Sequence, residues 1–142
     1  MEIIFIMILT LCVVFIIPWM MKKDFEKSML KNLRREITHN IEQLQEYNRE
    51  DPGRSRTLQG LGQIEGDTRP LILKDAVFRK IQQMDFCSKG LTDEDKELLE
   101  KVFATSSLLV VAVSDRDDRQ LCAENMRILE DVLSRLTAYI KD

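Results

Sequence analysis

Residues 3–21 read IIFIMILTLCVVFIIPWMM, nineteen consecutive positions without a charged side chain. A helix rises about 1.5 Å per residue, so this run covers roughly 28 Å, close to the hydrocarbon thickness of a bilayer. A core helix of a small domain is seldom apolar on every face over such a length. The run therefore predicts a transmembrane helix as the first element of the chain.

The C-terminal end of the run has the features of a membrane–water boundary. Pro18 lies in its last turn, where a kink is tolerated near the interface. Trp19 follows at a depth that suits an indole ring, and Lys22 and Lys23 end the apolar stretch. We predict Trp19, Lys22, Lys23 and Lys27 as the membrane-interface residues.

Two kinds of cleaved signal are disfavoured by the same region. A secretion signal needs a basic n-region, a shorter apolar core and a small-residue cleavage site. The chain begins Met-Glu, and no A-x-A-like triplet follows the run. A lipoprotein signal is disfavoured because Cys12 follows Leu11, where a small residue is required, and lies inside the run. We expect an uncleaved anchor.

Charge around the run predicts its orientation. Residues 22–35 hold six basic and two acidic side chains, whereas the N-terminal side has only the α-amino group and Glu2. The positive-inside rule then places the N-terminus outside the cell membrane and the remaining domain in the cytoplasm. Cys87 and Cys122 are the only cysteines beyond the run, and they show no disulfide-framework spacing, which agrees with a cytoplasmic domain.

The rest of the chain carries apolar residues at helical spacing and predicts an all-α fold. One N-terminal transmembrane helix is expected to continue into a small antiparallel helical bundle. Pro52 and Gly53 should end the first long helix. The predicted organisation is an anchor at 1–22, a juxtamembrane amphipathic helix at 23–50, a loop at 51–70, and a bundle at 71–142 completed by 23–50.

Three further helices are expected, at 71–86, about 93–113 and about 117–140. Gly90 suits a C-terminal cap for the first of these, and Thr92 suits an N-cap for the second. Three acidic residues follow Thr92, which favours a helix N-terminus there. The core stripe predicted for the helix at 93–113 is Leu98, Val102, Phe103, Leu109 and Val113.

The sequence contains no clear pattern of catalytic, metal-binding or phosphate-binding residues. Glu36 and His39 have the Glu-x-x-His spacing of di-iron bundles, but there is no second copy, and a solvated surface histidine is the better interpretation. A zinc site from His39, Cys87 and Cys122 has no supporting C-x-x-C or H-x-x-x-H spacing. The glycine-rich segment at 60–66 lacks the Gly-Lys-Ser/Thr ending of a phosphate loop. We predict a non-enzymatic protein without a cofactor or metal.

The expected partners are lipid and protein. The formal net charge of −3 and the membrane position favour lipid headgroups over nucleic acid as the contact of the basic residues at 22–35. No specific small molecule is predicted. Candidate partner contacts are apolar residues in the polar loop and in the LLVVAV segment that follows it later in the chain: Leu58, Leu61, Ile64, Leu108, Val110 and Val111.

Two functions from different classes fit this organisation. The first is a membrane-anchored interaction protein, either an accessory or scaffolding subunit of a larger membrane assembly or a homo-oligomer. The alternative is a sensor or effector whose helical domain binds a small ligand and signals through the span.

The order of features resembles a loose group of uncharacterised bacterial and archaeal single-pass membrane proteins. Their first soluble helix reads roughly L-x-x-E-I-x-x-N-x-x-x-L, matched here by Leu33, Glu36, Ile37, Asn40 and Leu44. A later L-x-x-D-A-aromatic motif is similar to LILKDAVF at 71–78, with Ile72 at the leucine position and Val77 at the aromatic position. The resemblance implies a helical fold and membrane attachment and brings no activity with it.

Overall fold

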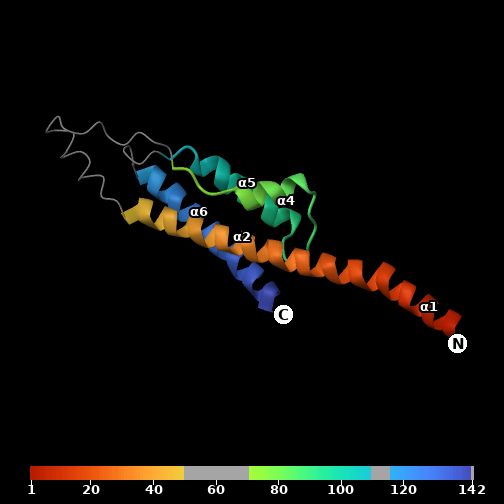
Figure 1. The fold of residues 1–142 in the computed structure, drawn as a ribbon. Coiled ribbons are helices and arrows are strands. Elements are labelled where there is room, and N and C mark those ends of the chain that lie inside the picture. The colour runs from red at the N-terminus through yellow and green to blue at the C-terminus, as the bar shows by residue number, and fades with distance from the viewer. Residues whose placement is uncertain (50–70, 110–115, 142) are drawn as a thin grey trace, which may run out of the picture.

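One continuous helix forms the axis of the molecule. The computed structural model describes residues 1–49, 71–109 and 116–141 (Figure 1). Helix α1 (Glu2–Leu11), the π-helical turn η1 (Cys12–Ile16) and α2 (Ile17–Arg49) follow one another without a break. The expected direct continuation of the apolar helix into the bundle is therefore observed.

Three further helices follow in the described ranges. They are α4 (Ala76–Gln83), α5 (Asp93–Ser106) and α6 (Arg116–Lys141). No β-strand occurs within the described ranges, and the predicted all-α fold is confirmed.

The π-helical turn is explained by the proline that follows it. Pro18 has no N–H to donate, and its ring crowds the carbonyl four residues earlier. The N–H of Ile17 bonds to the carbonyl of Cys12, five residues back, so the turn is wider than an α-helical one. This local widening lets the helix pass through Pro18 without ending.

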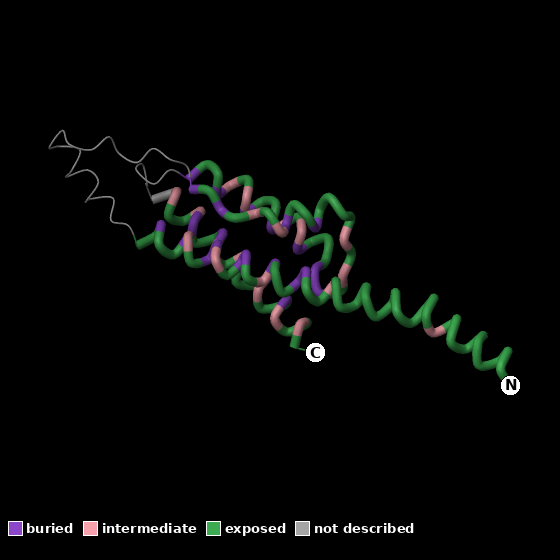
Figure 2. The backbone as a smooth tube through the Cα atoms, viewed as in Figure 1, coloured by how far each residue is buried: buried purple, intermediate pink, exposed green. Residues whose placement is uncertain are grey.

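Burial divides the long helix into two parts (Figure 2). Up to Ser28 no residue is fully buried. From Met29 onward, residues spaced three or four apart are buried on one face, as expected of an amphipathic helix packed against a core. These residues are Met29, Leu30, Leu33, Glu36, Ile37, Asn40, Ile41, Leu44 and Tyr47.

The bundle helices pair in antiparallel fashion. Between α2 and α6, the hydroxyl of Tyr139 donates to Glu26 at 3.0 Å, whereas the thiol of Cys122 donates to the carbonyl of Leu44 at 3.3 Å. One end of α2 therefore lies beside the opposite end of α6. Helices α5 and α6 are also antiparallel, since Asp95 contacts Arg135 near one end of the pair and Lys101 contacts Glu124 toward the other.

The helix expected at 71–86 is shorter, and that expectation is wrong at both ends. Residues 71–75 are not helical because their backbone groups bond elsewhere: Leu71 N–H donates to the carbonyl of Leu109 at 2.9 Å, and Lys74 bonds to Asn40. At the other end α4 stops at Gln83.

Asp85, rather than Gly90, ends α4. Asp85 has a φ of 47°, and the N–H of Phe86 reaches back to the carbonyl of Ile81 at 3.1 Å. This is the left-handed helix ending that glycine usually provides. Gly90 has a different reason to lack a side chain, because a Cβ there would lie 2.4 Å from the Cδ1 of Tyr139.

The helix expected at 93–113 begins as predicted but ends early. Thr92 caps it, accepting from the N–H of Asp95 at 3.2 Å while Asp95 accepts from the N–H of Thr92 at 3.1 Å. The helix ends at Ser106, and residues 110–113 lie outside the described ranges.

The core stripe predicted for this helix is confirmed at Val102 and Leu109, which are fully buried, and Phe103 is partly buried against the core. Val113 lies outside the described residues. The prediction is wrong at one position, because Leu99 is fully buried whereas Leu98 is only partly buried. Asp95 lies on the same face and pairs with Arg135 of α6. Leu99 comes one helical turn after Asp95, so the two side chains share one buried face of α5.

Candidate membrane and partner interfaces

The apolar N-terminal helix is the first candidate interface. It is the one helix of the described residues that is long and apolar enough to cross a membrane. None of its apolar window is buried against the bundle, so it is not a core helix of this fold. The hydroxyl of Thr10 donates to the carbonyl of Ile6 at 2.7 Å, which satisfies the donor within the helix. The surface offered by residues 3–21 is therefore almost purely apolar.

The predicted interface residues lie together on the helix where this surface ends. Trp19, Lys22, Lys23 and Lys27 are all exposed. The Nζ of Lys23 lies 5.5 Å from the ring centroid of Trp19, one turn earlier, in cation–π geometry. Aromatic and basic side chains thus share one short segment, an arrangement that suits a lipid headgroup layer.

A pair of polar side chains on α2 holds the start of α4. The two carboxylate oxygens of Glu36 each accept a backbone N–H, from Val77 and from Phe78, both at 3.0 Å. One turn further, the side-chain amide of Asn40 donates to the carbonyl of Lys74 at 2.7 Å and accepts from its N–H at 2.8 Å. Glu36 therefore caps a helix that lies forty residues later in the chain, and Asn40 pairs with the backbone that leads into it.

The environment of Glu36 changes its acidity. Burial raises the pKa of its carboxyl above 4.5, and the nearby Asp75 adds to this, although the backbone N–H bonds act in the opposite direction. Burial is the largest of these effects.

This shift implies a pH dependence of stability. A carboxyl with a raised folded-state pKa stabilises the fold fully below its unfolded pKa, and this contribution is lost as the pH rises through the folded-state pKa. We expect the free energy of unfolding to fall as the pH increases above 4.5, with a smaller fall in Glu36→Gln. Urea unfolding of both proteins at several pH values checks this, and identical pH profiles would contradict it.

A second buried polar group joins α5 to α6. The side-chain amide of Asn125 donates to the hydroxyls of Thr105 and Ser106, both at 3.0 Å. Asn125 and Ser106 are almost fully buried. Such a satisfied polar contact within a core favours one register of the two helices over others.

The face formed by α4 and α5 carries a groove of about 360 Å³. Its apolar lining includes Leu73, Phe78 and Phe103. The ring centroids of Phe78 and Phe103 lie 5.2 Å apart. Asp75 and Arg79 form an ion pair at its edge. Ile72, which is 80% exposed, belongs to its lining, and Leu108, which is 72% exposed, directly follows the lining residue Ser107 in the chain.

The structure describes one of the six predicted partner contacts. Leu108 is exposed, as a partner contact requires. Leu58, Leu61, Ile64, Val110 and Val111 lie outside the described residues. Ile72 was not among the predicted contacts because it was assigned to a helix. The bonds of Glu36 to α4 and of Asn40 to Lys74 could not be predicted, because nothing local in the sequence identifies their partners.

Metal-ligating side chains do not gather in the described ranges. No group of three or more His, Cys, Asp and Glu residues there could hold a metal ion. His39 is a partly exposed residue of α2. The three cysteines are free thiols, and burial raises the pKa of Cys122 to about 11.

The cysteines outside the apolar run should therefore differ sharply in reactivity. Cys87 is exposed, whereas Cys122 is buried and almost entirely protonated at neutral pH. We expect a maleimide to modify Cys87 in the folded protein and Cys122 only after unfolding. Peptide mass spectrometry after timed labelling measures both sites, and comparable rates at the two sites would contradict the expected burial.

No protein-family model, curated protein or solved structure matches the chain.

Proposed function

We propose that this protein is a non-catalytic, membrane-anchored interaction protein, an accessory or scaffolding subunit of a larger membrane assembly or a homo-oligomer. The apolar helix anchors the chain, with the N-terminus outside the cell membrane and the bundle in the cytoplasm. The basic residues at 22–35 support this orientation, because cationic flanks are retained on the cytoplasmic side.

The observation that carries the proposal is the groove between α4 and α5 with its exposed apolar border. Apolar side chains that surround a concave surface are typical of a docking site for another polypeptide. Ile72 and Leu108 are the two most exposed large apolar residues beyond the anchor in the described ranges. Their burial by a partner would remove this surface from water, which is the main driving force of association.

The native mass of the complex tests this proposal. The full-length protein would be extracted from its own membranes in a mild detergent and analysed with whatever remains bound. We expect a defined assembly larger than the monomer. A monomer without other subunits would contradict the proposed function.

A matched pair of variants tests the surface itself. The double variant Ile72→Asp with Leu108→Asp should dissociate the assembly while the melting temperature of the bundle stays nearly unchanged, since both side chains are exposed. The control replaces Ala123 and Ser134, exposed positions on α6, by aspartate and adds the same charge. An assembly that survives the first variant would show that the groove is not the docking site.

One observation favours the alternative, a ligand-dependent sensor. The helix from Glu2 to Arg49 is continuous, so a movement of the bundle would be transmitted to the span. The groove has a volume within the usual range of small-molecule sites. A screen of small polar metabolites for a rise in melting temperature would separate this alternative from the interaction protein.

A further inference from the structure

The end of the bundle nearest the apolar run, which we call the membrane-proximal end, is held together around Glu26. The loop between α4 and α5 (residues 84–92) reaches α2 here, where the hydroxyl of Ser88 donates to Glu26 at 2.6 Å. The hydroxyl of Tyr139 on α6 donates to the same carboxylate oxygen at 3.0 Å. One acidic side chain thus fixes two other segments beside the helix.

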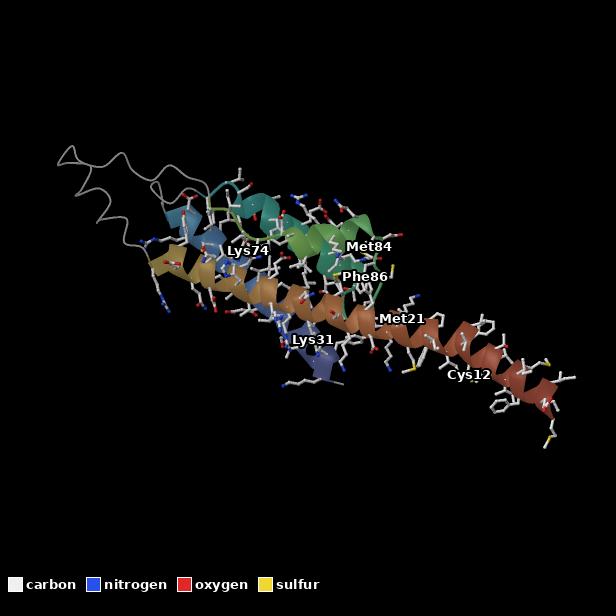
Figure 3. All side chains as sticks on the ribbon, in the orientation of Figure 1. Cys12, Met21, Lys31, Lys74, Met84 and Phe86 are labelled. Atoms are coloured by element: carbon white, nitrogen blue, oxygen red, sulfur yellow. The ribbon has the colours of Figure 1, made fainter. Side chains whose placement is uncertain are left out.

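Aromatic packing strengthens this arrangement. Phe25 of α2 and Phe86 of the loop lie with ring centroids 6.5 Å apart in an edge-to-face arrangement. Figure 3 shows Met84 and Phe86 on the part of the bundle that lies next to Met21. The loop is therefore attached to the first turns of α2 that follow the apolar run.

The depth of these turns follows from helix geometry. Glu26 comes five residues after Met21, which is about 7.5 Å along the helix axis. The headgroup layer extends roughly 5–8 Å beyond the hydrocarbon on each side of a bilayer. If the hydrocarbon boundary lies at Met21, Phe25 and Glu26 lie within or just outside the headgroups, and so does the loop bonded to them.

The surface of this end suits such a position. Beyond Met21, five large apolar or aromatic side chains of the described residues are exposed. Three of them lie at the membrane-proximal end: Phe25 at 41%, Met84 at 48% and Tyr139 at 39%. Lys22, Lys23, Lys27 and Lys89, all exposed, add cationic groups to the same end. Such a mixture of apolar and lysine side chains is characteristic of protein surfaces that rest in a lipid interface.

We propose that the membrane-proximal end forms a second lipid-binding surface beside the span, in which Phe25, Met84 and Tyr139 enter the headgroup layer and Lys89 joins the interface lysines Lys22, Lys23 and Lys27 at the lipid phosphates. The inference rests on the proposed span and goes beyond it. The α4–α5 loop and the end of α6 then both contact the bilayer beside α2, and the bundle is not held away from the membrane by α2 alone. The exposed groove at Ile72 and Leu108 is held at a fixed height above the membrane.

Cys87 provides a probe within this surface. It is exposed in the α4–α5 loop, and Cys122 is buried. An environment-sensitive fluorophore would be attached to Cys87 in full-length Cys12→Ala, reconstituted into vesicles of phosphatidylcholine with a minority of phosphatidylglycerol. The matched control carries the fluorophore at position 45, in Cys12→Ala, Cys87→Ser and Gln45→Cys, since Gln45 is exposed near the far end of α2.

Two quenchers separate the possible positions of the loop. We expect spin-labelled lipid headgroups to quench the probe at Cys87 several-fold more than the probe at position 45, and aqueous iodide to quench them in the reverse order. Equal quenching at both positions in protein that floats with the vesicles would overturn the second lipid surface while leaving the anchor intact. Protein that fails to float would overturn both the anchor and this inference.

Discussion

Replacing Glu36 by alanine is expected to destabilise the bundle by about 3 kcal/mol, because two backbone donors, one buried and one partly buried, would lose their acceptors at once. Each N–H, of Val77 and of Phe78, is bonded to its own carboxylate oxygen at 3.0 Å. Water cannot easily replace the carboxylate at a site that is 8% exposed. The free energy of unfolding is measured by urea titration of the full chain in a mild detergent, with the helical circular dichroism signal as the readout.

A matched control separates this effect from the loss of a charge on α2. Glu42 is an exposed glutamate of the same helix, and Glu42→Ala should change stability by no more than about 0.5 kcal/mol. If the two variants are equally stable, Glu36 does not hold α4 in place.

The second large effect is expected in the core of α5, for Leu99→Ala. Leu99 is fully buried, and truncation of a buried leucine costs roughly 2–5 kcal/mol through lost transfer energy and the cavity that remains. We expect about 3 kcal/mol by the same unfolding measurement.

The neighbouring leucine provides the control. Leu98 is only partly buried, so Leu98→Ala should cost less than about 1 kcal/mol. The order of the two values tests which residues of α5 face the core. A larger loss for Leu98 than for Leu99 would place Leu98 in the core, as the sequence periodicity predicts.

The features that could be predicted from the sequence are those with a local cause. The apolar run from Ile3 to Met21 sets a helix of membrane length regardless of what packs nearby. The stripe on α2 and the cap at Thr92 depend on residues three or four apart in the sequence. These local patterns are enough to specify an all-α fold.

The features that could not be predicted depend on contacts between distant segments. Glu36 and His39 have the Glu-x-x-His spacing of di-iron bundles, but the hydrogen-bond partners of Glu36 lie on α4, about forty residues away. Asn125 interrupts an apolar stripe on α6, and its bonds with Thr105 and Ser106 become visible only when α5 is packed against it. The end of α4 at Asp85 was missed for a related reason, since a left-handed aspartate is far less common there than a glycine.

The candidate interfaces divide in the same way. Trp19 and the lysines that follow it are recognisable from their order along the chain. The groove on α4 and α5 requires the fold, because Leu73, Phe78 and Phe103 come from separate segments. Leu108 was a predicted partner contact, and Ile72 is an exposed apolar residue that was not predicted as one.

The most direct test of the proposed architecture is protease digestion of sealed, inverted membrane vesicles that contain the full chain with a C-terminal epitope tag. A single span with a cytoplasmic bundle exposes the tag on the outside of such vesicles, so we expect it to be removed without detergent. A tag that stays protected until detergent is added would place the bundle on the other side of the membrane. That result would contradict the orientation derived from the basic residues at 22–35.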